Sequence, residues 1–210
     1  MASTGGHASA CAEICRPGLT DSDSRVPNAV YRPRLAPDNG ASDDDGVVPL
    51  PHSFAVGILA ATVRRARADD VPEIVDLIAA DQLGTHRDGV RSEADQAAYL
   101  AAFRAIDADA SETLVVAEHE GRIIGTLQLS LIPGLARRGA LRAQIEAVRV
   151  HELLRGRGVG SALLSWAIDE ARHRGCALVQ LTSDKSRTDS HRLYGRLGFA
   201  ASHEGFKLQL

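Results

Sequence analysis

The segment RGRGVG (residues 155–160) places three glycines within five residues, between two regular elements. LRAQIEAVRV (141–150) before it is rich in strand-forming residues, and SALLSWAIDEARHRG (161–175) after it has the apolar spacing of a helix. The unpaired N–H groups and the dipole at a helix start favour an anion, and glycines let a bulky phosphate approach them. The pattern predicts an anion site, to which Arg155 and Arg157 add positive charge.

Two common phosphate-binding motifs do not fit this segment. A P-loop requires Lys followed by Ser or Thr after its glycines, and no such pair follows here. The dinucleotide fingerprint G-x-G-x-x-G would have Ser161 in place of its last glycine when counted from Gly156, and Leu163 when counted from Gly158. A tight turn without any ligand therefore stays open as an alternative.

The strand before the glycines changes its alternation. Its apolar residues are odd-numbered up to Ala147 and even-numbered from Val148 onward. Because a regular strand keeps its apolar residues at one parity, the change predicts a β-bulge near Glu146 to Val148. A bulge leaves backbone groups unpaired and splays the strand from its neighbour, which makes a slot for an extended, amide-bearing ligand. A phosphate at the helix start and an amide arm in the slot together describe coenzyme A.

Two motifs of this chain have a spacing found in a known family. The first is V-x-V followed by R-x-x-G-x-G, carried by Val148, Val150, Arg155, Gly158 and Gly160. The second is Y-x-x-x-G-F, carried by Tyr194, Gly198 and Phe199. Together they resemble the GNAT superfamily of N-acetyltransferases over about residues 61–210. The resemblance implies an α/β (α+β) fold with a mixed central sheet of about six to seven strands, about four flanking helices and a splayed central strand pair.

Acetyl-CoA is the co-substrate that this resemblance implies, and no metal is expected. The N–H groups near the glycines would hold the pyrophosphate, the main chain of Val148 and Val150 the pantetheine arm, and the Val148 N–H the thioester carbonyl. Many members of the family carry an asparagine before the last helix, where this chain has TSDKSRTDS (182–190). The residues expected to bind the coenzyme are Val148, Arg149, Val150, Arg155, Gly156, Arg157, Gly158, Val159, Gly160, Ser161 and Arg187.

Direct attack of an amine on the thioester requires a base for the ammonium group and an acid for the leaving thiolate. Glu146 is the candidate general base, since a partly buried carboxylate beside parted strands suits proton transfer; an ordinary polar residue on an exposed face is the alternative. Gln144 shares its parity and is a candidate to order a water. The family motif makes Tyr194 the candidate general acid; a tyrosine packed on the core is its alternative.

The remaining segments predict further regular elements. A short strand begins near Ala61 and leads into a helix with Pro72 at its start, and a second helix opens at Ser92. TLVVAEHEGRIIGTLQLS (113–130) predicts a hairpin that turns at Glu120 and Gly121. Downstream, the pattern predicts a helix that ends at Gly175, a strand over 176–183, a short helix over 189–197 and a final hairpin over 198–210.

The N-terminal part differs in composition from the rest. Residues 1–60 hold six of the eight prolines and the whole excess of negative charge in a chain of net charge −3. Such a segment buries too little apolar surface to offset its ordering entropy, so we expect a disordered tail over 1–58 and one domain over 59–210. The small net charge, the lack of a signal or membrane-spanning run, and only three cysteines indicate a cytoplasmic protein.

The expected partners are acetyl-CoA and a primary amine of a small molecule, peptide or protein, without nucleic acid or membrane, for a monomer or homodimer. The loops QLGTHRDGVR (82–91) and IPGLARRGA (132–140) are expected to shape the acceptor pocket. Arg137 and Arg138 in the second loop suit an acceptor that carries an acidic group; two solvated arginines on a surface loop are the alternative. A non-catalytic acetyl-CoA sensor on the same fold is the alternative to an enzyme.

Overall fold

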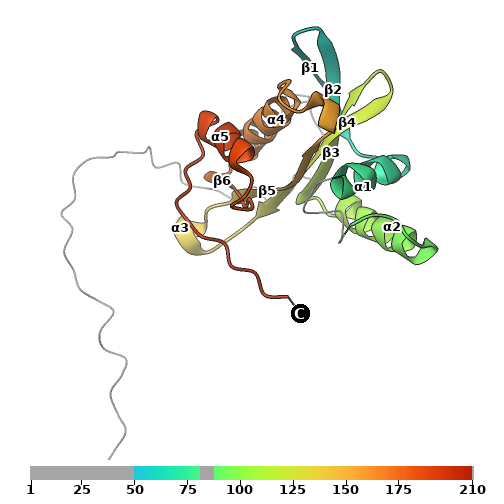
Figure 1. Cartoon of the computed structure of the whole chain (residues 1–210). Coiled ribbons are helices and arrows are strands. Elements are labelled where there is room, and N and C mark those ends of the chain that lie inside the picture. Colours follow the sequence, from blue (N-terminus) through green and yellow to red (C-terminus); the bar gives the residue numbers. More distant parts are fainter. Residues whose placement is uncertain (1–49, 81–87, 210) are drawn as a thin grey trace, which may run out of the picture. The chain divides into compact units, whose positions relative to one another are not determined.

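The computed structural model describes residues 50–80 and 88–209, all within one compact unit that spans residues 31–210. One six-stranded sheet forms its centre (Figure 1). The strands are β1 (His52–Val56), β2 (Leu59–Arg65), β3 (Glu112–His119), β4 (Arg122–Ile132), β5 (Arg142–Val150) and β6 (Leu178–Leu181). They lie in chain order and are antiparallel, except for the parallel pair β5–β6. This mixed sheet confirms the predicted fold class.

Helices cover both faces of the sheet. They are α1 (Val71–Ala79), α2 (Glu93–Ala108), α3 (Ala136–Gly139), α4 (Val159–His173) and α5 (Thr188–Arg196), with short 3₁₀ turns at Ala68–Asp70 and Glu152–Leu154. In Figure 1, α1 and α2 lie on one face, and α4 and α5 on the other. Leu127 and Ile145 of the sheet pack in one buried cluster with Leu163 of α4. Val116 packs in a second cluster with Phe103 of α2.

Local signals at the ends of several elements are confirmed. The Ser92 hydroxyl accepts a hydrogen bond from the Asp95 N–H at 3.2 Å and caps α2. Glu120 and Gly121, with φ values of 49° and 76°, close the β3–β4 hairpin at the predicted turn. Gly175 has a φ of 72° just after α4, as expected for a residue that ends a helix. Each of these outcomes depends on residues close together in the chain.

The predicted bulge is present in β5. Thr126 of β4 pairs with Arg149, and Gln128 pairs with Glu146, so one residue of β4 faces two residues of β5. The extra residue is at Ala147, whose φ of 51° lies in the left-handed region. Pairing between β5 and β6 ends just before the bulge, at Ile145 and Leu181. The second half of β5 therefore has β4 on one side and none of the described strands on the other.

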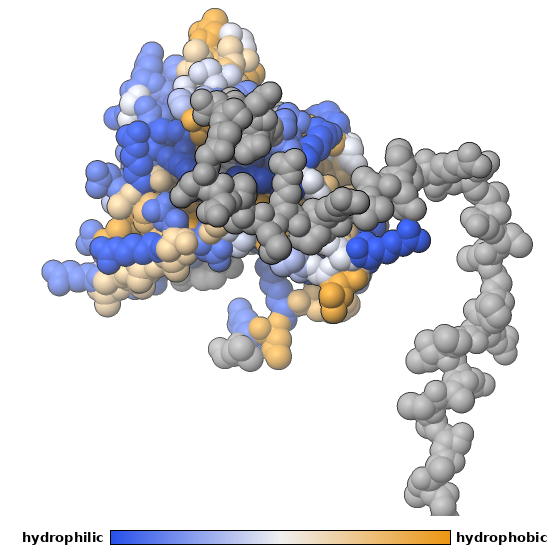
Figure 2. Space-filling model, turned by 180° about the vertical axis from the view of Figure 1, so that it is seen from behind, coloured by the Kyte–Doolittle hydropathy of each residue, from blue (hydrophilic) through white to orange (hydrophobic). Residues whose placement is uncertain are grey.

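The predicted tail extends too far along the sequence. Residues 52–56 were expected to be disordered, yet they form β1, which pairs antiparallel with β2 over five residues. Phe54 packs against the cluster beneath α4. This burial and the pairing with β2 order a segment whose composition by itself predicts disorder. The tip of the β1–β2 hairpin is apolar, as the top of Figure 2 shows, and its Ile58 is fully exposed. Residues 1–49 lie outside the described part.

The predicted final hairpin is wrong for the described residues 198–209. They contain no strand, and Phe206 and Leu208 are 90% and 86% exposed. An alternating pattern forms a strand only where a neighbouring strand accepts its hydrogen bonds, and this segment does not pair with β6. The extra helix relative to the expected four is α3, a single turn in which Arg137 and Arg138 have φ values of 54° and 60°.

An ion-pair network fixes the start of α1 against the sheet. Arg64 of β2 donates to Asp70 from Nη1 at 2.6 Å and from Nη2 at 3.0 Å, and from Nε to Glu118 of β3 at 2.6 Å. Asp70 also accepts from the Arg67 N–H at 2.6 Å. Burial raises the pKa of Asp70, but these hydrogen bonds outweigh it, so the pKa lies below its ordinary value.

Among the helices of the described residues, none combines the length and the apolar character that crossing a membrane requires.

Candidate active site

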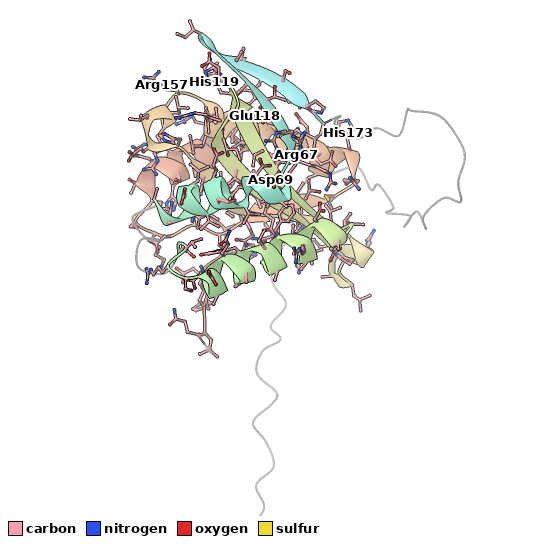
Figure 3. All side chains as sticks on the ribbon, turned by 90° about the vertical axis from the view of Figure 1, so that its right-hand side faces the viewer. Arg67, Asp69, Glu118, His119, Arg157 and His173 are labelled. Atoms are coloured by element: carbon pink, nitrogen blue, oxygen red, sulfur yellow. The ribbon has the colours of Figure 1, made fainter. Side chains whose placement is uncertain are left out.

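The glycine segment leads directly into α4, as predicted. Gly158 has a φ of 89° and caps the helix, and the first hydrogen bond across the cap runs from the Ala162 N–H to the Gly158 carbonyl at 3.0 Å. The N–H groups of residues 159–161 therefore precede the helical ladder, and the first turn carries no acidic side chain. Figure 3 shows Arg157 directed outward beside this turn. The arrangement has the positive character that an anion requires.

The three glycines serve different purposes. A β-carbon on Gly156 would meet nothing within 4 Å, which is the open approach expected for a ligand. A β-carbon on Gly158 would lie 2.5 Å from Cγ1 of Val56, so packing of β1 already requires a glycine there. A β-carbon on Gly160 would make ordinary contacts at 3.6 Å. Ligand approach alone therefore does not explain the glycine pattern.

The open side of β5 carries the backbone groups predicted to pair with the pantetheine arm. The Val148 carbonyl accepts a hydrogen bond from Nη1 of Arg149 at 2.8 Å. The Val150 carbonyl accepts one from Nε of Arg155 at 3.3 Å. Both carbonyls thus point away from the β4 ladder, and guanidinium groups of the chain itself meet them. A ligand amide that pairs with these carbonyls would take the place of the two arginine donors.

Tyr194 of α5 lies half-buried beside this slot. Its ring meets Phe199 edge-on, with centroids 6.0 Å apart and an interplanar angle of 67°. Burial raises the pKa of the Tyr194 phenol; the charges of Arg187 and Arg149 and an interaction with the Ser183 hydroxyl lower it by less. The phenol is therefore protonated at neutral pH, which is the state a proton donor needs. Arg187, the predicted phosphate contact, stands near this phenol.

Glu146 lies on the opposite face of the sheet from Tyr194. It shares that face with Gln144, whereas Ile145 between them packs beneath α4. The expectation of a partly buried carboxylate is wrong, because the side chain is exposed at the end of the β5–β6 pairing. Gln144 was expected to order a water; instead, its Nε2 donates directly to Oε1 of Glu146 at 2.9 Å. The candidate base and acid therefore flank the parted strands from the two faces.

Two polar residues were not predicted from the sequence: Gln180 in β6, and Ser183 just after the end of that strand. Gln180 donates from Nε2 to Oε1 of Gln144 at 2.6 Å. Ser183 lies near the phenol of Tyr194, and its buried hydroxyl has no hydrogen-bond partner among the described residues. Gln180 could have been found from the sequence, because a glutamine within the apolar run LVQL marks the face on which the strand is not covered. No local signal pointed to Ser183.

The two loops expected to shape the acceptor pocket differ in what the structure describes. Residues 82–87 of the first lie outside the described part. In the second, Arg137, Arg138 and Gly139 all have positive φ, which makes the tight turn α3 between β4 and β5. Arg142 follows this turn and shares the sheet face of Gln144 and Glu146. Three arginines thus stand at or near the start of the strand that carries the candidate base.

Residues 72–199 match the profile of the acetyltransferase (GNAT) family. The chain belongs to this family. Acetyl-CoA is the acetyl donor of the family, and the GNAT domain includes every residue that the preceding paragraphs place at the glycine segment, the slot and the two proton-transfer positions. The chain is accordingly an acyltransferase.

Individual relatives agree with this assignment. Aminoalkylphosphonate N-acetyltransferase of Salmonella typhimurium is 29% identical over 144 residues, which cover 69% of this chain and 88% of that protein. Glucosamine 6-phosphate N-acetyltransferase of Trypanosoma brucei brucei is 36% identical over 43% of this GNAT chain and 59% of its own length. A solved structure described as a transcriptional regulator from Bacillus halodurans C-125 is 43% identical, with a TM-score of 0.68, and covers 71% of this chain and 99% of its own.

Proposed function

We propose that this GNAT chain transfers the acetyl group of acetyl-CoA to a primary amine by direct attack within a ternary complex. One observation carries the proposal: pairing between β5 and β6 stops at Ile145, directly before the bulge, with Glu146 on one face of the gap and Tyr194 on the other. An amine can then approach the thioester from the face of Glu146 while the coenzyme occupies the face of α4 and α5.

Binding of the coenzyme is assigned mainly to main-chain groups. The N–H groups of Gly156 and of residues 158–161 receive the pyrophosphate at the start of α4, where the helix dipole favours negative charge. The N–H groups of Arg155 and Arg157 already donate to the carbonyls of Glu152 and Leu154, at 3.2 Å and 3.3 Å. The carbonyls of Val148 and Val150 receive amide N–H groups of the pantetheine arm. The N–H of Val148 is assigned to the thioester oxygen, where it stabilises the negative charge that develops during attack.

Two proton transfers accompany the exchange of bonds. Glu146 accepts a proton from the acceptor ammonium, and the freed lone pair forms the new C–N bond with the carbonyl carbon. The C–S bond then breaks, and Tyr194 donates its phenolic proton to the departing thiolate. After the attack the nitrogen carries two protons and loses one of them to the Tyr194 phenolate, which restores the phenol and leaves a neutral amide. Glu146 then releases its proton to solvent and returns to its carboxylate. The upward direction of the Tyr194 pKa keeps this proton in place before the reaction.

The acceptor is a small primary amine that also carries an anionic group. Two relatives are described as acting on amines with a phosphonate or phosphate group. Arg142 precedes Glu146 on β5 and shares its face of the sheet, with Gln144 between them on that face. Arg137 lies in the turn before Arg142. An acceptor bound with its amine at Glu146 would therefore direct an anionic end toward these arginines.

A thiol-release assay with acetyl-CoA and an amine panel tests the proposal. The panel contains aminoalkylphosphonates, a phosphorylated amino sugar, uncharged primary amines and N-terminal peptides. Phosphoryl-bearing amines are expected to react best, and Glu146→Gln and Tyr194→Phe to lower kcat by about 10²-fold each, the usual size of a lost acid or base. Full activity of both variants would contradict the assigned roles.

A second function is favoured by the relative described as a transcriptional regulator, which is 43% identical. On that view, the chain binds acetyl-CoA and responds to it without turnover. The same assay separates the two functions when it is combined with thermal unfolding. Protection by acetyl-CoA against heat, with no thiol released from any amine, would favour the sensor over the enzyme.

A further inference from the structure

A chain of hydrogen bonds crosses the uncovered part of the sheet and ends on the candidate base. Gln180 of β6 donates from Nε2 to Oε1 of Gln144 on β5 at 2.6 Å. Gln144 in turn donates from Nε2 to Oε1 of Glu146 at 2.9 Å. The two glutamines are directly paired residues of the parallel strands, one step before the pairing ends. The chain therefore bridges the two strands at the point where they begin to part.

The direction of this chain follows from the chemistry of its last member. An ionised carboxylate only accepts hydrogen bonds, so Gln144 must turn its amide nitrogen toward Glu146. Its amide oxygen then faces β6, and Gln180 must supply a donor to it. Only this orientation satisfies both contacts. The amide of Gln180 thus determines which end of Gln144 faces the carboxylate.

We propose that Gln180 and Gln144 are positioning residues, which hold Glu146 so that one carboxylate oxygen is occupied and the other faces the acceptor amine. This inference rests on the proposed acetyl transfer, in which Glu146 is the base. An exposed glutamate otherwise samples several rotamers, and a base that is misplaced by one of them no longer reaches the ammonium proton. The two strands that frame the slot thereby also orient the group that acts beside it.

The first test measures the rotamer populations of the Glu146 side chain by NMR in the full-length protein, with the signals assigned through Glu146→Gln. Gln144→Leu removes the donor, so the Glu146 side chain is expected to change from one dominant rotamer to several. Gln180→Glu preserves shape but replaces the donor by an acceptor. It is expected to turn the Gln144 amide around and to cause the same loss of a dominant Glu146 rotamer.

Gln128→Leu provides a matched control. Gln128 lies on the same face and directly opposite Glu146, yet it donates to Glu112 at 2.8 Å instead. The same loss of an amide is therefore expected to leave the Glu146 rotamer populations unchanged. The inference is overturned if Gln144→Leu and Gln180→Glu do not change these populations, or if Gln128→Leu changes them as much.

Kinetics with aminoethylphosphonate and acetyl-CoA give the second test. Gln144→Leu and Gln180→Glu are expected to lower kcat by about tenfold, less than loss of the base itself, and to leave KM for acetyl-CoA within about twofold. A rise in KM for acetyl-CoA with unchanged kcat would instead indicate a merely structural effect on the slot. If the unaltered protein acetylates no amine, the proposed function fails, while the rotamer measurement still decides whether the glutamines orient Glu146.

Discussion

Val56 of β1 occupies the space in which a side chain at position 158 would stand. A β-carbon on Gly158 would lie 2.5 Å from Cγ1 of Val56, closer than two non-bonded carbon atoms can approach. The first strand of the sheet therefore packs directly on the turn that opens α4. The N–H groups of this turn are assigned to the pyrophosphate. The β1–β2 hairpin therefore packs against the proposed coenzyme site, although it precedes residues 72–199, which match the family profile.

We expect Gly158→Ala to lower the free energy of unfolding by about 2–5 kcal/mol. The left-handed conformation of residue 158 costs a side chain about 1–2 kcal/mol, and the clash with Val56 adds a further 1–3 kcal/mol. Gly156→Ala is the matched control, since its φ of 75° brings the same strain but open space surrounds its β-carbon. Urea unfolding should show a smaller loss for Gly156→Ala, and Val56→Ala should recover part of the loss in Gly158→Ala. Equal losses in the two glycine variants would contradict the packing role.

We expect Tyr194→Phe to change stability at alkaline pH. The folded protein holds the phenol above its ordinary pKa, because burial disfavours the phenolate. The unfolded chain therefore loses this proton first, and stability that is complete below pH about 10 declines as pH rises toward the folded value. Comparing urea unfolding at pH 8 and at pH 10.5 should show a smaller decline for Tyr194→Phe than for the unaltered protein. The same decline in both proteins would mean that the phenol is not shielded.

Arg64→Met is expected to lower the free energy of unfolding at pH 7 by about 3 kcal/mol, because it leaves Asp70 buried without its cation. The folded pKa of Asp70 lies below its ordinary value, so this stabilisation is present above pH about 4 and is lost as pH falls through the folded pKa. The difference between variant and unaltered protein should therefore shrink toward pH 3. Arg65→Met, at the exposed neighbour, should cost less than about 1 kcal/mol. A loss at pH 7 no larger than that of Arg65→Met would show that the network contributes little.

Arg142→Glu should discriminate between acceptors by charge. If Arg142 meets the anionic end of the acceptor, the reversal lowers kcat/KM for an aminoalkylphosphonate by about tenfold, equivalent to roughly 1.4 kcal/mol. For an uncharged amine of similar length, kcat/KM should change by less than about twofold. Steady-state kinetics with both amines measures the ratio. A uniform loss for both acceptors would exclude a selective contact with the anion.

Much of the fold and part of the candidate site follow from residues near one another in the chain. The change of parity between Ala147 and Val148 predicts the bulge that the structure contains at Ala147. Glu120 and Gly121 predict the hairpin turn, and the glycines before Val159 predict the helix start. These features are readable because periodicity and preferred backbone angles act over only a few residues.

Tertiary structure decided what depends on partners distant in the sequence. β1 forms because it pairs with β2 and packs on the cluster beneath α4, and Gly158 is required because Val56 lies against it. Gln144, which donates to Glu146, accepts in turn from Gln180 of another strand. The final segment shows the converse, since its alternating residues find no strand edge and stay unpaired. By itself, the sequence determined the bulge, the turns and the family motifs. Only folding decided which side chains those elements bring together, because contacts between distant residues leave no periodic trace in either segment.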